Sequence, residues 1–220
     1  MKKSIVLFIS LFFIATLSLL VLKNLKDTDS YLSEQNAKFT KTQILFYINN
    51  AKDEISKVFS KNLEREALGE YVGLEFPLII QDAKITMRLE EYDKYNINLL
   101  SEKDEKKYEF FKDFLIRNDI YDIDILRSNL LENNKIRNSK QLDFLLEKFQ
   151  KESYTSDIFK VKDYIGFMNY DKKEISQNEK EKEILFYELF IKVDYLKQFA
   201  KAYYILNKNG GVEYFEYSFK

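Results

Sequence analysis

The sequence contains no cysteine and no histidine, and these two absences exclude several classes of chemistry. Without cysteine there is neither a disulfide nor a thiol nucleophile, and without histidine the usual general base near neutral pH is missing. Zinc sites built from cysteine and histidine are excluded for the same reason. Only five glycines and one proline are present, too few glycines for a phosphate-binding loop. We expect no cofactor and no metal.

Charge of neither sign dominates, because 35 basic residues balance 36 acidic ones. A net charge of −1 provides no global field toward nucleic acid or anionic lipid, so DNA is expected as a partner only indirectly. Carboxylate pairs such as Glu90–Glu91 and Asp122–Asp124 could in principle do acid–base work. In a chain with 36 acids such pairs arise without a catalytic role. We therefore expect a protein that is not an enzyme.

Tyrosines are abundant near the C-terminus, where they could either bind nucleic acid or pack within a sheet. Tyr203, Tyr204, Tyr214 and Tyr217 could stack on bases of single-stranded nucleic acid. No basic groove is evident beside them in the sequence. Packing within a sheet is the favoured interpretation.

An uncharged apolar run begins after Met1-Lys2-Lys3-Ser4. Residues 5–22 contain no charge, and as a helix they extend about 27 Å, close to the ~30 Å hydrocarbon core of a bilayer. A cleaved secretory signal is the main alternative, but no small-x-small site follows Leu22. The run predicts a retained transmembrane helix over 5–22 behind a cytoplasmic leader of residues 1–4.

The orientation of this helix rests on the basic residues around it. Lys2 and Lys3 stand directly at the first end, which favours a cytoplasmic N-terminus. Lys23 and Lys26 flank the other end, so the count of basic residues alone does not decide the orientation. The prediction is a single-pass inner-membrane protein with its C-terminal domain in the periplasm.

Apolar residues recur every seven positions after the span. Leu25, Leu32 and Phe39 follow this spacing, and polar residues separate them. The pattern predicts an amphipathic helix over 23–68, either continuous with the span or interrupted near residues 27–30. Such a helix requires a partner on its apolar side.

The remaining chain divides into four segments. Turn residues and alternation predict a strand-containing head segment over 69–104. Helical periodicity covers 105–168, with breaks near 118–119, 133–139 and 153–157. Residues 169–182 form a polar linker, and 183–220 predict an antiparallel three-stranded meander in which Asn209-Gly210 supplies a tight turn. The predicted fold is α+β: a long N-terminal helix, a helical insertion and a C-terminal antiparallel sheet.

This order of parts resembles the pseudopilins of type II secretion and of type IV pilus-like competence systems. The stretch Lys94-Tyr95-Asn96-Ile97-Asn98-Leu99 is similar to a motif of the K-type minor pseudopilin, with Lys94, Asn96, Asn98 and Leu99 as its matching positions. The helical segment 105–168 stands where that family inserts a helical subdomain. The likeness covers the architecture of the whole chain, but motif-like detail extends over about fifteen residues.

The resemblance implies processing, contacts and function. Processing would occur between Ser4 and Ile5, although the family's peptidase normally cuts after glycine. Family members bind calcium through acidic residues, but the spacing of Asp119, Asp122 and Asp124 is not that of an EF-hand. The helix–helix contacts implied with other pseudopilin-like subunits involve Ile5, Phe8, Phe12, Leu19, Leu25, Leu32 and Phe39.

The sequence and the resemblance leave two functions open. The first is a non-enzymatic, membrane-anchored structural subunit, with a pilin-like head, that acts in assembly of a secretion or DNA-uptake filament and so in protein transport or competence. The alternative is a single-pass periplasmic scaffold or interaction protein of another envelope complex. Recovery of filament subunits with the protein would separate the two.

Overall fold

The computed structural model describes residues 2–60, 71–102, 105–133, 135–168 and 186–220. Side chains are described throughout these ranges except at 2–10, 60 and 133. The chain forms two compact units. The first unit contains residues 1–90 and 187–220, and the second contains residues 91–186, inserted between two strands of the first. The predicted leader side chains, linker 169–182 and helix end 61–68 lie outside the described residues.

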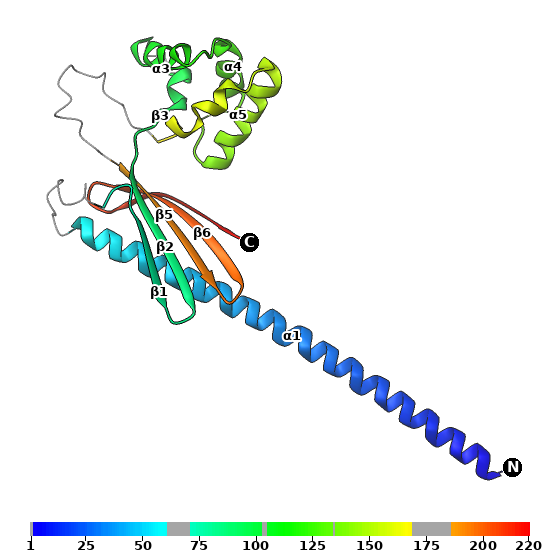
Figure 1. The fold of residues 1–220 in the computed structure, drawn as a ribbon. Coiled ribbons are helices and arrows are strands. Elements are labelled where there is room, and N and C mark those ends of the chain that lie inside the picture. Colours follow the sequence, from blue (N-terminus) through cyan, green and yellow to red (C-terminus); the bar gives the residue numbers. More distant parts are fainter. Residues whose placement is uncertain (1, 61–70, 103–104, 134, 169–185) are drawn as a thin grey trace. The chain divides into compact units, whose positions relative to one another are not determined.

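Helix α1 (Lys2–Ser60) is the longest element of the first unit, and it is continuous (Figure 1). No interruption occurs at residues 27–30, although Asp, Thr and Ser there disfavour a helix interior. The Thr28 hydroxyl donates to the carbonyl of Asn24 at 2.8 Å, within the same helix. The bond follows the helical register, so the local polar group does not compete with the helix.

The sheet of the first unit has five strands in the order β1-β2-β5-β6-β7, and neighbouring strands are antiparallel. Segment 69–104 contributes two of these strands, so the C-terminal meander is only part of a larger sheet. The expected order of a long helix, a helical insertion and a C-terminal antiparallel sheet is confirmed. The strands are β1 (Glu75–Ile80), β2 (Ala83–Glu91), β5 (Phe186–Tyr195), β6 (Gln198–Asn207) and β7 (Val212–Phe219).

Pro77, one of the turn residues of segment 69–104, lies inside β1. Proline cannot donate a backbone hydrogen bond, and it is therefore found on edge strands. β1 is such an edge, because it pairs only with β2. Gly73, another turn residue of this segment, has a φ of +80° and lies in a turn.

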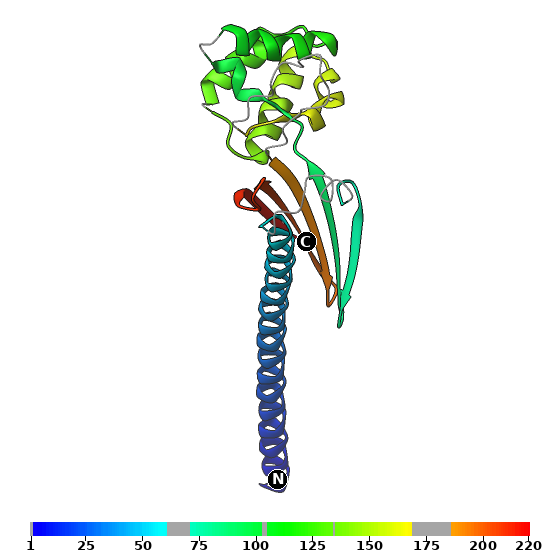
Figure 2. The ribbon, with the colours of Figure 1, turned by 90° about the vertical axis from the view of Figure 1, so that its left-hand side faces the viewer.

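One face of the sheet packs on the C-terminal half of α1 (Figure 2). Two ring contacts fix the face: Phe59 meets Tyr187 at 4.9 Å, and Tyr47 meets Tyr195 at 5.7 Å between centroids. Alternation then places every second residue of each strand toward the helix. The buried core of this unit includes Ile44, Tyr47, Ile48, Ala51, Phe59, Ile85, Leu89, Leu189, Ile191, Val193, Ala200, Ala202 and Leu206.

The turn between β6 and β7 is held against α1 by Gly210. Its φ is +79°, which confirms the positive-φ turn predicted from Asn209-Gly210. A Cβ at this position would lie 2.7 Å from the carbonyl oxygen of Ser56. Glycine is therefore required by backbone conformation and by close approach to the helix.

The second unit is built from three helices around a core of leucine and phenylalanine. They are α3 (Glu105–Arg117), α4 (Ile123–Asn133) and α5 (Ser139–Ser153), with breaks where the sequence predicted them. Short 3₁₀ helices, η1 (Ile97–Ser101), η2 (Asp157–Lys160) and η3 (Lys162–Tyr164), and a parallel two-residue pairing of β3 (Tyr95–Asn96) with β4 (Ile165–Gly166) complete the unit. The fully buried side chains include Leu100, Phe111, Leu115, Leu126, Leu130, Leu145 and Phe149.

Candidate interaction surfaces

The N-terminal part of α1 exposes large apolar side chains on all sides. Nine of them between residues 11 and 22 are 55% to 68% exposed, and the chain's own fold covers none of them fully. Phe12 and Leu19, two of the predicted contacts, belong to this set. Ser4, Ile5 and Phe8 lie in the first turns of α1, where side chains are outside the described residues. The nine residues are Leu11, Phe12, Phe13, Ile14, Leu17, Leu19, Leu20, Val21 and Leu22.

Such exposure is costly in water. Burying a large apolar side chain contributes about 1.5–3 kcal/mol, so nine side chains left more than half exposed forgo on the order of 10 kcal/mol. This equals the entire stability of a typical domain. An exposed apolar surface of this extent is typical of a membrane or protein contact.

Within the described residues, no helix combines the length and the apolarity that a membrane crossing needs. The predicted span 5–22 begins in residues whose side chains are not described. It stays a prediction.

The seven-residue stripe lies on the face of α1 that points away from the sheet. Leu25, Leu32 and Phe39 are each slightly more than half exposed. Phe46 continues the spacing and is 57% exposed, whereas Ile44, two residues earlier, is fully buried against the sheet. Two residues turn a helix by about 200°, which places Phe46 opposite the packed face. Phe46 was not among the predicted contacts, although the same spacing identifies it.

The motif that carries the family resemblance forms a structural centre of the second unit. Asn98 is 6% exposed, and its amide nitrogen donates to the carbonyls of Ile136 (3.0 Å) and Phe167 (3.3 Å). Its Oδ1 accepts from the backbone N–H of Ile136 at 2.7 Å. Asn96 caps η1 by accepting from the backbone N–H of Asn98. The two asparagines connect segments that are distant in sequence.

Lys94 and Leu99 have simpler surroundings. The Lys94 ammonium lies 5.8 Å from the centre of the Tyr92 ring, and Leu99 is buried in the core. Ser101, the last residue of η1, donates its hydroxyl to the carbonyl of Asn98. Helix α3 begins four residues later, at Glu105.

The four tyrosines considered for base stacking divide between the two faces of the sheet. Tyr203 and Tyr214 are neighbours on the face away from α1, with ring centroids 6.1 Å apart. Tyr204 and Tyr217 lie on the other face, because they pair with Phe215 and Ala202 in the ladder. Burial, and then the nearby carboxylate of Asp53, raises the pKa of Tyr204. The four rings therefore do not make one platform.

Two of the acidic residues considered above, Glu90 and Asp119, are engaged by neighbouring side chains. Glu90 forms an ion pair with Arg88 at 3.2 Å. Asp119 accepts a hydrogen bond from the Tyr121 hydroxyl at 3.1 Å, and this bond raises the pKa of Tyr121. In the part of the chain that the structure describes, no three carboxylate, histidine or cysteine side chains come together as a metal site would require.

A depression of about 720 Å³ lies beside the β6–β7 turn. Asp53 and Glu54 of α1 line it together with Asn209 and the Gly210-Gly211 backbone. Asp53 is paired with Lys52, and Glu54 accepts from Lys57 at 2.6 Å. The carboxylates are thus neutralised within α1, and the depression presents no concentrated charge.

Comparison of the chain with protein-family models, curated proteins and solved structures gave no match.

Proposed function

We propose that the protein is a non-enzymatic, membrane-anchored subunit that acts in assembly of a secretion or DNA-uptake filament and resembles a K-type minor pseudopilin. The observation that carries the proposal is the apolar surface of α1 over residues 11–22, which the chain's own fold leaves exposed on all sides. A bilayer would cover this surface before assembly. Helices of sister subunits would cover it afterwards.

Two further features support a filament subunit over a simple anchor. The helix is continuous from the apolar part into the part that packs on the sheet, so a force or displacement at one end is transmitted to the other. The exposed stripe Leu25, Leu32, Phe39 and Phe46 extends the apolar surface beyond the predicted span. An anchor alone needs no such extension.

The scaffold alternative is favoured by a different observation. The second unit has its own core and also exposes apolar side chains, among them Leu131 (59%) and Phe144 (60%). A binding module for another envelope protein has these properties. Under this alternative, α1 only anchors the chain and the second unit binds the partner.

The membrane part of the proposal predicts position-dependent effects of arginine. Phe12→Arg places a charge near the middle of the predicted span, which costs about 2.5–3.5 kcal/mol on insertion scales. Leu22→Arg is the matched control, because an arginine at the end of a span extends to the interface at little cost. We expect Phe12→Arg to lower the membrane-integrated fraction after alkaline extraction, and Leu22→Arg to leave it near wild type. Equal behaviour of the two variants would contradict a span at this position.

The filament part is tested by recovery of partners. Tagged full-length protein is crosslinked mildly in native membranes and purified, and partners are identified by mass spectrometry. Pilin-like subunits, their ATPase or the platform protein are expected. Recovery of an unrelated envelope complex without any of these supports the scaffold alternative instead.

A further inference from the structure

The turn between β6 and β7 contains an asparagine followed directly by glycine, the dipeptide in which an asparagine side chain is most readily converted to a carboxylate. Asn209 is exposed within the turn, and the buried Gly210 follows it. Glycine favours this conversion because it has no Cβ to hinder the approach of its backbone nitrogen to the preceding side chain. The local sequence therefore makes Asn209 a candidate site of covalent modification.

The reaction needs no reagent other than water. The backbone nitrogen of Gly210 gives its proton to solvent and attacks Cγ of the Asn209 side chain. The bond from Cγ to the amide nitrogen then breaks, and ammonia leaves. Water opens the resulting cyclic succinimide at either of its carbonyls. One opening gives aspartate, and the other gives isoaspartate, in which the main chain runs through the former side chain and is longer by a carbon atom.

In the folded chain, Asn207 holds the turn in a conformation that opposes this reaction. The backbone N–H of Gly210 donates to the carbonyl of Asn207 at 2.9 Å. The side-chain oxygen of Asn207 accepts from the backbone N–H groups of Asn209 at 3.0 Å and Gly211 at 2.9 Å. Its side-chain nitrogen donates to Glu213 at 2.8 Å. Ring closure must release the Gly210 N–H and rotate the backbone at Asn209, so these bonds slow it.

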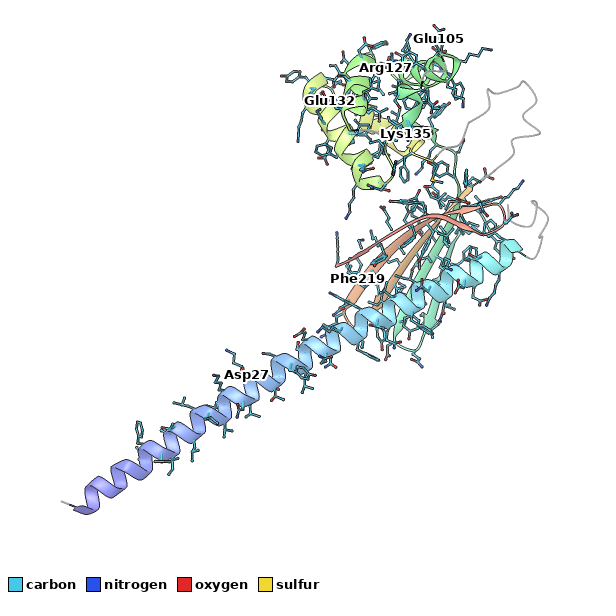
Figure 3. All side chains as sticks on the ribbon, turned by 180° about the vertical axis from the view of Figure 1, so that it is seen from behind. Asp27, Glu105, Arg127, Glu132, Lys135 and Phe219 are labelled. Carbon is cyan, nitrogen blue, oxygen red and sulfur yellow. The ribbon has the colours of Figure 1, made fainter. Side chains whose placement is uncertain are left out.

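The same turn is seated on α1. A Cβ at Gly210 would lie 2.7 Å from the carbonyl oxygen of Ser56. From the turn, β7 extends to Phe219, whose ring centre lies 5.9 Å from the Lys41 ammonium of α1 (Figure 3). Because Gly210 already lies so close to Ser56, a longer main chain cannot keep the same position. Isoaspartate at position 209 would therefore move the start of β7 away from the helix.

We propose that Asn209 is a deamidation site whose rate is set by Asn207. Conversion is slow while the turn is bound to α1 and fast once the turn opens. The product carries a new carboxylate beside Asp53 and Glu54, which line the same depression as Asn209. Opening of the turn thus leaves a lasting chemical mark, and the isoaspartate form cannot return to its place on the helix. The inference is independent of the proposed function.

The test compares rates of conversion in the full-length protein. Purified protein in detergent is incubated in mildly alkaline buffer at physiological temperature. Liquid chromatography with mass spectrometry then resolves the asparagine, aspartate and isoaspartate forms of the turn peptide. Asn207→Ala removes the oxygen that accepts from two backbone N–H groups. Asn207→Asp is the matched control, because it keeps an accepting oxygen and, like alanine, loses the donor to Glu213. The wild-type chain unfolded in urea gives the rate without the turn.

We expect Asn209 to convert several-fold faster in the unfolded chain than in the folded wild type. Asn207→Ala should approach the unfolded rate, and Asn207→Asp should stay near the folded one. Equal rates in the folded and unfolded wild type would show that the turn gives no protection and would overturn the proposal. Equal rates in the two variants would overturn the role of Asn207.

Hydrogen exchange on the same samples separates loss of the turn from general unfolding. Peptides from β5 should exchange at the wild-type rate in Asn207→Ala. Faster exchange throughout β5 in that variant would attribute its conversion to unfolding and overturn the role of Asn207. The isoaspartate form of the wild type should exchange faster at the start of β7, and unchanged exchange there would overturn the displacement from α1.

Discussion

Replacement of Asn98 by leucine tests the structural centre of the second unit. The change keeps the approximate size of the side chain but removes every hydrogen bond that its amide makes. The backbone N–H and carbonyl of Ile136 lose their side-chain partner, and the carbonyl of Phe167 loses a donor. Because Asn98 is buried, water cannot readily replace these bonds.

The magnitude follows from the number of groups left without a partner. Each buried polar group that loses its hydrogen bond costs about 1–3 kcal/mol, and leucine recovers part of this by apolar packing. We expect Asn98→Leu to lower the free energy of unfolding of the second unit by about 3–5 kcal/mol. The control is Asn138→Ala, which removes one N-cap bond to the backbone N–H of Gln141 and should cost about 1 kcal/mol.

Hydrogen exchange measured by mass spectrometry on the full chain distinguishes the two units. Asn98→Leu should raise exchange throughout peptides from η1, α4 and α5, and leave peptides from β5 and β6 near wild type. Asn138→Ala should affect mainly the start of α5. If Asn98→Leu were no more destabilising than Asn138→Ala, the hydrogen-bonding role assigned to Asn98 would be wrong.

Two further predictions concern the first unit. Gly210→Ala should destabilise it by roughly 2 kcal/mol or more in urea unfolding, because φ is +79° and the new Cβ would lie 2.7 Å from the Ser56 oxygen. Gly73→Ala, with φ of +80° but no atom within 4 Å, should cost only about 1 kcal/mol, and equal losses would refute the close-approach argument. The raised pKa of Tyr204 stabilises the folded state while the ring is neutral, so this contribution is lost as pH rises above about 10, where tyrosine ionises in the unfolded chain. Tyr204→Phe should make the unfolding free energy fall less steeply above that pH. An unchanged slope would contradict the raised pKa of Tyr204.

Local patterns in the sequence predicted the helices, their breaks and the β6–β7 turn, because each depends on neighbouring residues. The continuity of α1 at residues 27–30 could not be read in the same way. There Asp27, Thr28, Asp29 and Ser30 disfavour a helix interior, yet the helix continues through them. Whether the helix continues through such a stretch depends on the surrounding structure, which composition does not specify.

The pairing of strands that are distant in the chain was the main feature that could not be predicted from the sequence. β2 and β5 are neighbours in the sheet, although about a hundred residues separate them. Nothing in the alternation of either segment identifies its partner. The role of Asn98 was hidden for the same reason, since Ile136 and Phe167 reach it only through the fold.

The exposed apolar stripe on α1 was partly predictable. The seven-residue spacing of Leu25, Leu32 and Phe39 indicated one face, and the structure leaves that face uncovered. Whether the apolar helix lies in lipid or against other helices is a property of the assembly and stays a proposal.

The central claim is that α1 is stored in a membrane and packs with pilin-like subunits. Crosslinking of the full-length protein in native membranes, followed by purification and mass spectrometry, tests this claim most directly. The account predicts that other pilin-like subunits, the ATPase or the platform protein are recovered, and that Phe12→Arg abolishes their recovery while Leu22→Arg does not. Recovery of an unrelated complex alone, or undiminished recovery of filament subunits with Phe12→Arg, would contradict it.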